Sequence, residues 1–160
     1  MPQFDLSATT DGRWAVLTVS GELDLATAPA LRECLGEVID GGVRHVVVDL
    51  RQVGFLDSIG LGVLVGAYRR LHHGEPVGSL RLVCTNERVV RVFELTGLLL
   101  LFPLHASVEQ ARAAAGRPPG RAVRRRRRRL ARRASQAVQA AALVAVGLGW
   151  QVGDLEPEPP

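Results

Sequence analysis

Apolar residues recur along the first 115 residues with two different periods, which predict strands alternating with helices. The clearest pair lies near the middle of this region. A near-continuous apolar run at residues 46–50 is typical of a strand covered on both faces. The spacing then becomes helical, and one helical face holds Leu61, Leu64, Val65, Tyr68 and Leu71. The pattern therefore predicts a buried strand, a short connection, and a helix that begins at Asp57 or Ser58.

The segments on either side of this pair follow the same alternation. Asp11 and Gly12 lie between two strand-like segments, residues 4–9 and 14–20, and predict a hairpin turn. A helix capped by Thr27 should end at Gly41 and Gly42. The later predicted elements are a strand at residues 80–84, a helix between Asn86 and Gly97, a strand at residues 98–102 that Pro103 stops, and a short helix capped by Ser107 and Gln110.

This order, β-β-α-β-α-β-α-β-α, predicts the α/β fold class. Strands that alternate with helices form a mostly parallel sheet with the helices packed against it. The hairpin at the start adds an antiparallel strand, so the sheet should be mixed. We predict a single domain over residues 1–115.

Charge changes sign after this region. Residues 1–115 hold 10 Arg and 13 acidic residues, a net charge of −3, whereas residues 116–160 hold 10 Arg and 3 acidic residues, a net charge of +7. The two values give the +4 of the whole chain, which contains no lysine. The high isoelectric point therefore belongs to residues 116–160, which we call the tail.

The tail begins with a linker-like segment, residues 117–120, followed by six consecutive arginines at residues 124–129. Like charges in a row repel, so we predict a disordered or weakly helical tail unless a polyanion binds it. An Ala/Val/Leu-rich stretch at residues 137–146 fits a short helix but not a membrane span, which needs about 20 apolar residues. No transmembrane segment is predicted. Without aromatic residues among the arginines, only weak, non-specific nucleic-acid binding is expected.

The cysteines and the N-terminus give no sign of a metal site or of secretion. Cys34 and Cys84 are far apart and form no CxxC pair, which predicts free thiols and neither a zinc site nor a disulfide framework. Residues 1–10 lack a basic region followed by an apolar one. We expect a cytoplasmic protein without a cofactor.

The sequence also argues against an enzyme. A hydrolase nucleophile elbow at Ser58 would need a glycine where the chain has Leu56. The residues from Gly60 to Gly62 begin like a dinucleotide-binding motif, but Val65 occupies the place of its third glycine. Nothing in the sequence places a histidine beside Ser58.

The start of the central helix is the most distinctive site. Asp57 and Ser58 are both suitable N-cap residues, and the sequence does not decide between them. In either case the Ser58 hydroxyl lies in or near the first helical turn. That position tolerates a phosphate, because unpaired N–H groups and the helix dipole favour negative charge there.

The same helix has apolar residues opposite its core face, namely Ile59, Val63 and Ala67. Gly60 and Gly62 lie among them, and each costs about 1 kcal/mol relative to alanine in a helix interior. Two interpretations have equal weight. Either another protein surface approaches the helix backbone closely, or the helix makes a tight contact with its own sheet.

Three segments carry a resemblance to a known family. They are GELDLATAPALRE at residues 21–33, VVVDLRQVGFLDSIGLGVL at residues 46–64 and RVFELTGLLLLF at residues 91–102. Together they resemble the STAS-domain anti-sigma-factor antagonists of bacteria over residues 3–115. The resemblance implies that Ser58, directly after the aspartate, is the phosphoacceptor. Many members carry a second serine or a threonine next, where this chain has Ile59, so an alternative acceptor is missing.

The resemblance also implies a function. The unphosphorylated form would bind an anti-sigma factor that is itself a serine kinase and would free a sigma factor. Phosphorylation of Ser58 would end this binding, and a PP2C-type phosphatase would reverse it. The loops that carry Asp24 and Asp57 would meet at one edge of the domain. The expected partner-binding residues are Asp24, Asp57, Ile59, Gly60, Gly62 and Val63.

Two other hypotheses stay open at this point. The first is a STAS module for assembly or for sensing a small ligand, in which Ser58 is never modified. The second places the function in the tail, which would bind nucleic acid or anionic lipid electrostatically.

Overall fold

The structure is a computed structural model that describes residues 3–74 and 76–115, together with residues 125, 129, 132, 133 and 136. Its strands are β1 (Asp5–Asp11), β2 (Trp14–Leu23), β3 (His45–Leu56), β4 (Ser79–Val83) and β5 (Leu104–His105). Its helices are α1 (Ala28–Asp40), α2 (Ser58–His73), α3 (Glu87–Leu95), α4 (Val108–Ala115) and the short 3₁₀ helix η1 (Leu98–Leu100).

The five strands form one sheet in the order β1-β2-β3-β4-β5. β1 pairs with β2 in the antiparallel sense, and each later neighbour is parallel. The predicted mixed, mostly parallel sheet with an antiparallel hairpin at its start is therefore confirmed. Gly12 has a φ of +59° at the hairpin turn, a left-handed conformation that glycine adopts without strain.

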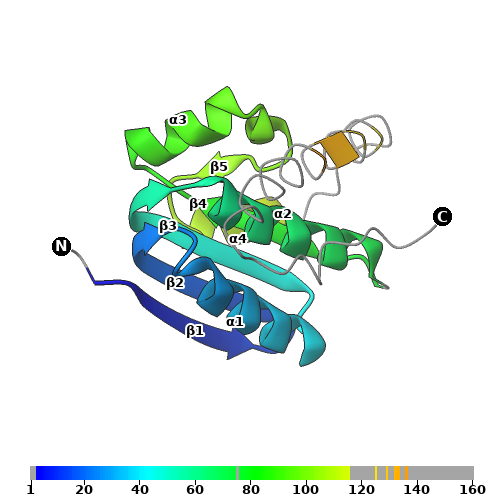
Figure 1. Ribbon diagram of the computed structural model, residues 1–160. Coiled ribbons are helices and arrows are strands. Elements are labelled where there is room, and N and C mark those ends of the chain that lie inside the picture. Colours follow the sequence, from blue (N-terminus) through cyan, green and yellow to red (C-terminus); the bar gives the residue numbers. More distant parts are fainter. Residues whose placement is uncertain are drawn as a thin grey trace.

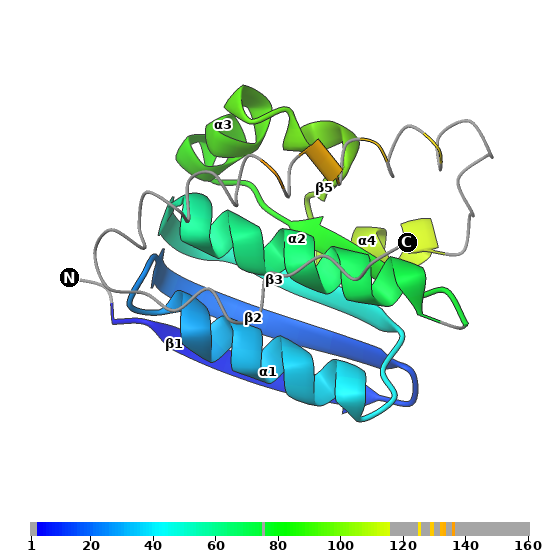
Figure 2. The same ribbon diagram turned by 45° about the vertical axis from the view of Figure 1, so that its right-hand side comes forward.

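Helices cover both faces of this sheet. Figures 1 and 2 show α1 and α2 side by side on one face and α4 on the other. Side chains of the inner strand β3 point alternately to the two faces of the sheet. Val46, Val48 and Leu50 join the main core, whereas Val47 packs with Val83 and Ala111 under α4. This double coverage explains the continuous apolar run that the sequence shows at residues 46–50.

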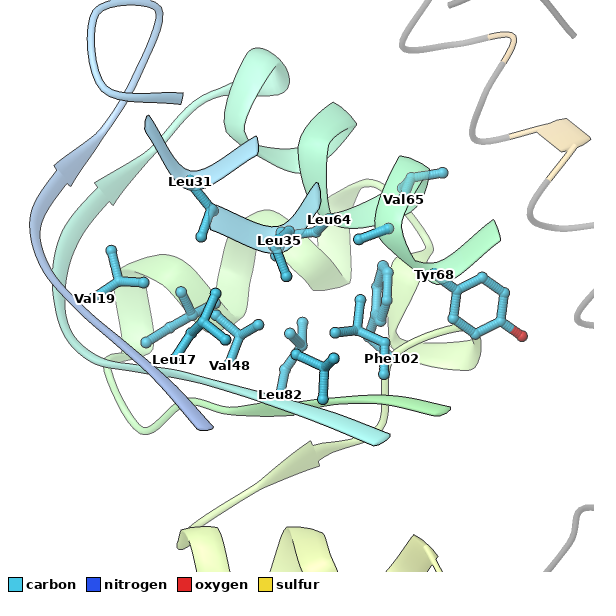
Figure 3. Close-up of a cluster of buried hydrophobic side chains, with 14 of the residues drawn as sticks. Leu17, Val19, Leu31, Leu35, Val48, Leu64, Val65, Tyr68, Leu82 and Phe102 are labelled. Carbon is cyan, nitrogen blue, oxygen red and sulfur yellow. The ribbon is translucent and has the colours of Figure 1, made fainter. Parts of the chain in front are cut away.

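The main core lies between the sheet and the helix pair (Figure 3). Leu31 and Leu35 of α1 and Leu64 of α2 face Leu17 of β2 and Val48 of β3. Burying each such side chain contributes about 1.5–3 kcal/mol to folding. These contacts fix where α2 begins at the edge of the sheet.

The prediction of a strand at residues 98–102 is wrong. These residues form η1 and the turn after it, and the last strand, β5, follows Pro103 instead of ending before it. Gly97 has a φ of +72° and turns the chain out of α3. The turn then buries Phe102 with its ring edge-on to Tyr68, at a centroid distance of 5.5 Å.

Two further expectations need correction. The central strand does not end at residue 50, because β3 continues to Leu56 by pairing with the end of β2 across two register shifts. Ala67 does not face outward. It is only 6% exposed, because α2 packs against α1 as well as against the sheet.

The predicted helix caps are partly confirmed. The Asn86 side chain accepts a hydrogen bond from Arg88 N at 3.0 Å and caps α3. Ser107 Oγ accepts from Gln110 N at 3.2 Å, whereas the Gln110 side chain accepts from Ala106 N, one residue before the expected cap. Thr27 precedes α1 but makes no side-chain cap.

The predictions for the tail concern residues that lie mostly outside the described ones. Residues 125, 129, 132, 133 and 136 are helical with exposed side chains. Among the helices that the structure describes, none combines the length and the apolar character that crossing a membrane requires.

α4 lies over a polar contact set at the amino-terminal end of the sheet. Arg81 Nη2 donates to Ala114 O at 3.0 Å, and the Arg112 guanidinium lies 5.2 Å from the Trp14 ring centre. Trp14 in turn packs on His45, with ring centres 4.9 Å apart.

Burial and the positive charges of Arg13 and Arg81 lower the pKa of His45, and burial and Arg81 lower the pKa of His105.

Gly60 provides a test of the packing between α2 and the sheet. A Cβ atom added there would lie 2.7 Å from Leu56 Cδ1 and 2.9 Å from Leu23 Cγ. Gly60→Ala should therefore lower the free energy of unfolding by about 1–3 kcal/mol. Gly66→Ala, on the same helix with nothing within 4 Å of the added atom, should raise it by about 0.5–1 kcal/mol. Denaturant unfolding of both variants measures the difference, and equal effects would contradict this packing.

The half-buried histidines His45 and His105 predict a loss of stability in mild acid. Their pKa values in the folded chain lie below the ordinary 6.5, so the unfolded chain takes up protons first as the pH falls below that value. The melting temperature should fall between pH 7.5 and pH 5.5, and it should fall less in the double variant His45→Gln/His105→Gln. The contrary result is a pH dependence that the double substitution leaves unchanged.

Candidate functional site

The site lies at the carboxyl ends of β2 and β3, where two loops meet. Leu23 pairs with Leu56 at the end of the two strands, and Asp57 N donates to Leu23 O at 3.2 Å. Asp24 follows Leu23 directly, so the loop before α1 lies against the start of α2. The expectation that the loops of Asp24 and Asp57 meet at one edge is confirmed.

Asp57, and not Ser58, caps α2. Its backbone is extended, with φ −100° and ψ −178°, and its Oδ1 atom accepts hydrogen bonds from Ile59 N and Gly60 N, both at 2.9 Å. Ser58 is the first residue of α2, and its side chain is exposed. The alternative that the sequence left open is thus resolved, and the Ser58 hydroxyl faces solvent.

This cap changes what a phosphate on Ser58 would meet. The sequence suggested free N–H groups in the first turn, but Asp57 already occupies those of Ile59 and Gly60. Leu61 N also has a partner, Asp57 O, at 3.0 Å. A phosphate would therefore add negative charge beside a carboxylate at a helix end where these three donors are satisfied.

Asp24 organises its own loop. Its Oδ1 accepts from Ala26 N at 2.9 Å and from Thr27 N at 3.1 Å. Thr27 Oγ1 donates to Glu22 O at 2.7 Å and accepts from Asp24 N at 3.0 Å, which ties the loop to the end of β2 and explains why Thr27 does not cap α1. In the described part of the chain no group of three His, Cys, Asp or Glu residues is arranged to hold a metal ion.

The predicted partner-binding residues on α2 divide into two sets. Ile59, Gly62 and Val63 are half-buried, and Val63 also packs partly against the main core. Gly60 is buried against Leu23 and Leu56, so the tight contact with the chain's own sheet explains this glycine. Its expected contact with a partner needs correction, because the domain itself covers it.

Sequence reasoning missed Phe55. This residue lies near the end of β3, pairs across the strands with the exposed Glu22, and is 49% exposed. The only signal in the sequence was an aromatic residue shortly before the cap, in a segment predicted to be a connection. Phe55 adds a large apolar side chain to the edge that carries Ser58.

An ion pair between the buried Asp49 and the exposed Arg51 supports β3 just before this edge. The Asp49 carboxylate, 6% exposed as a residue, accepts from Arg51 Nη2 at 2.7 Å and from Arg51 N at 3.1 Å. Burial opposes the charged form, but the hydrogen bonds and charge of Arg51 outweigh it and lower the pKa of Asp49. Asp49 is therefore a structural group within the strand.

The histidines of the described part of the chain lie away from Ser58. In the described residues, His45 lies at the amino end of β3, His72 and His73 end α2, and His105 lies near Arg81. None of these positions supplies Ser58 with the adjacent base that a nucleophilic serine requires. What the edge presents is an exposed hydroxyl with acidic and apolar neighbours.

Comparison with known proteins agrees with this arrangement. The STAS domain family model matches residues 5–111. The anti-sigma-B factor antagonist of Staphylococcus aureus strain NCTC 8325 is 33% identical over 105 residues, which cover 66% of this chain and 95% of the relative. The anti-sigma-B factor antagonist of Bacillus subtilis is 36% identical over 93 residues, which cover 58% of this chain and 83% of the relative.

Solved structures show the same fold. An anti-sigma factor antagonist from Mycobacterium paratuberculosis superposes with a TM-score of 0.65 at 33% identity, over 72% of this chain and 96% of the other. The anti-sigma factor antagonist SpoIIAA in its unphosphorylated form gives a TM-score of 0.60 at 23% identity, over 73% and 100%. Since the family model covers well over half of the sequence and the fold agrees, the chain belongs to the STAS domain family.

Proposed function

We propose that the chain is an anti-sigma-factor antagonist that phosphorylation of Ser58 switches off. The observation that carries the proposal is the exposed Ser58 at the first position of α2, next to the Asp57 cap. The Staphylococcus aureus relative, matched over nearly its whole length, is named an anti-sigma-B factor antagonist. The unphosphorylated chain binds an anti-sigma factor with serine kinase activity in the cytoplasm and thereby frees a sigma factor.

The binding surface combines one large apolar side chain with smaller ones. Phe55 is the most exposed of them, and Ile59 and Val63 are half-buried on the first turns of α2. Asp24, Asp57 and Glu22 provide an acidic surrounding. Such a surface fits a partner that offers an apolar pocket rimmed by basic groups.

The chemistry of the switch belongs to the partner. The Ser58 oxygen attacks the γ-phosphorus of the ATP that the kinase holds, the bond to the ADP oxygen breaks, and a base of the kinase takes the hydroxyl proton. A PP2C-type phosphatase then transfers the phosphoryl group to water and restores the hydroxyl. This chain contributes the acceptor and its geometry, and it acts as a binding protein without catalysis of its own.

Phosphorylation acts through charge. The phosphate adds a charge of about −1.5 to −2 next to Asp57, whose Oδ1 already accepts hydrogen bonds from two N–H groups. It stays hydrated, and removing that hydration in an apolar interface is costly. The kinase therefore releases the modified chain while the fold stays intact.

Binding titrations of Ser58 variants test the switch. Ser58→Ala should bind the anti-sigma kinase as tightly as the unmodified chain and should stay bound when ATP is added. Ser58→Asp should bind at least about tenfold more weakly, because a carboxylate adds charge at the same place. Mass spectrometry of the chain after incubation with kinase and ATP should locate the phosphate on Ser58.

Thermal unfolding is the control for these variants, and both should keep the cooperative transition of the unmodified chain. Phosphate on a different residue, or equal binding by all forms, would refute the switch. The chain would then be better described as a STAS module for assembly or for sensing a small ligand.

A second titration tests the apolar surface. Phe55→Ser should weaken kinase binding by about tenfold or more, since buried aromatic anchors dominate interface energies. Val77→Ser is the matched control: Val77 is 59% exposed but precedes β4 at the opposite end of the sheet. Val77→Ser should bind like the unmodified chain. Similar losses in both variants would show that Phe55 is not an anchor.

A further inference from the structure

Three exposed leucines lie together at the carboxyl end of α3. Leu95, the last residue of the helix, is 77% exposed, and Leu99 and Leu100 of the adjoining η1 are 37% and 49% exposed. We call these three residues the leucine patch. In the described part of the chain the remaining large apolar side chains that are exposed, Phe55 and Val77, lie at the Ser58 edge and just before β4. The leucine patch is therefore the one place where such side chains gather in the described residues.

The leucines are exposed because the residues around them are anchored. Leu98, Leu101 and Phe102 are buried in the main core, so the two leucines between them are left on the outside. At the end of α3, Thr96 Oγ1 donates to Val92 O at 2.7 Å. The leucine patch is thus a fixed feature of the folded domain and not a frayed helix end.

The leucine patch is a surface separate from the Ser58 edge. α3 begins near that edge, where the side chain of its cap Asn86 donates to Val53 O at 3.1 Å. Leu95 lies at the other end of the helix, whose nine residues span about 14 Å. Figures 1 and 2 show α3 and the turn after it at the margin of the domain, across the sheet from β1. Clustered apolar side chains in such a position are typical of an interaction surface.

Two opposite charges flank the leucine patch on the same side of α3. Arg91 and Glu94 are exposed and three residues apart, so their side chains lie next to each other along the helix. Within the described residues, neither side chain takes part in an ion pair. When two copies of α3 pack antiparallel across a two-fold axis with Leu95 near the axis, Arg91 of each copy lies opposite Glu94 of the other. The surface is therefore complementary to itself.

We propose that the leucine patch joins two copies of this chain in a symmetric, antiparallel contact between their α3 helices. Leu95 of each copy packs at the axis, and Leu99 and Leu100 lie on the α3 helix of the second copy. Two ion pairs between Arg91 and Glu94 flank this apolar centre. A second copy is favoured over a partner of one charge sign, because such a partner would leave either Arg91 or Glu94 facing a like charge.

The contact is weak and reversible. One helix of about 14 Å and a single turn cover less than the area of about 800 Å² per partner that a stable protein interface buries. The chain is accordingly a monomer when dilute and a dimer when concentrated. This inference does not rest on the proposed function, because no residue of the contact belongs to the Ser58 edge.

Sedimentation velocity of the full-length chain tests the proposal. The weight-average sedimentation coefficient should rise from the monomer value toward the dimer value over about a hundredfold range of concentration. Leu95→Ser should weaken dimerisation by about tenfold or more, because a central apolar anchor is lost. The triple variant Leu95→Ser/Leu99→Ser/Leu100→Ser should stay monomeric. Val77→Ser is the matched control, since it removes an exposed apolar side chain outside the patch and should dimerise like the unmodified chain.

Charge exchange tests the antiparallel arrangement. Arg91→Glu and Glu94→Arg should each dimerise less than the unmodified chain, because like charges then meet twice across the axis. An equimolar mixture of these two variants should recover the dimer, since each acidic flank then faces a basic one. These substitutions change exposed side chains, so each variant should keep the cooperative thermal transition of the unmodified chain.

Three results would overturn the proposal. The first is a chain that stays monomeric over the whole concentration range. The second is a triple leucine variant that dimerises like the unmodified chain. The third is a mixture of the two charge variants that dimerises no better than either variant alone.

Discussion

The structure of the site depends on Asp57. Its side chain accepts hydrogen bonds from Ile59 N and Gly60 N, and its own N–H donates to Leu23 O. One residue thereby ends β3, starts α2 and joins both to the end of β2. An N-cap of this kind contributes about 1 kcal/mol, so its importance lies more in position than in energy. It places Ser58 in the first helical turn and satisfies the donors that would otherwise attract a phosphate. Gly60 completes the arrangement, because only a residue without a Cβ atom lets α2 approach Leu23 and Leu56 this closely.

The edge exists because β2 and β3 extend beyond β4. Pairing of β3 with β4 ends at Asp49 and Val83, whereas pairing with β2 continues to Leu56. The extension is supported by the Asp49–Arg51 ion pair and by Asn86, whose side-chain amide donates to Val53 O at 3.1 Å. Phe55 and Ser58 therefore project from a supported strand and a capped helix, not from a free loop. A rigid edge of this type can carry a regulatory charge without a change of fold.

Local patterns predicted most of the fold and part of the site. The order of elements up to α3, the hairpin at Gly12 and the helix start at Asp57 or Ser58 follow from apolar period and turn chemistry, which are properties of neighbouring residues. The wrong predictions concern residues whose packing partners lie far away in the sequence. Residues 51–55 show no strand pattern because only β2 pairs with them, and so the exposure of Phe55 was missed. Ala67 is buried by α1, and Gly60 is buried against Leu23. Residues 98–102 turn at Gly97 because Phe102 packs on Tyr68. A run of five apolar residues fits a strand and a turn equally well.

We propose that phosphorylation of Ser58 changes the charge of the edge and leaves its structure unchanged. Amide hydrogen exchange at Ile59 and Gly60 tests this most directly, because both N–H groups are bonded to Asp57 Oδ1. If the phosphate stays in solvent, their protection should be the same in the phosphorylated and unmodified chains, while kinase binding is lost. If phosphorylation lowers the protection of these two amides by about tenfold or more, the cap opens, and the switch is conformational and not a change of charge alone.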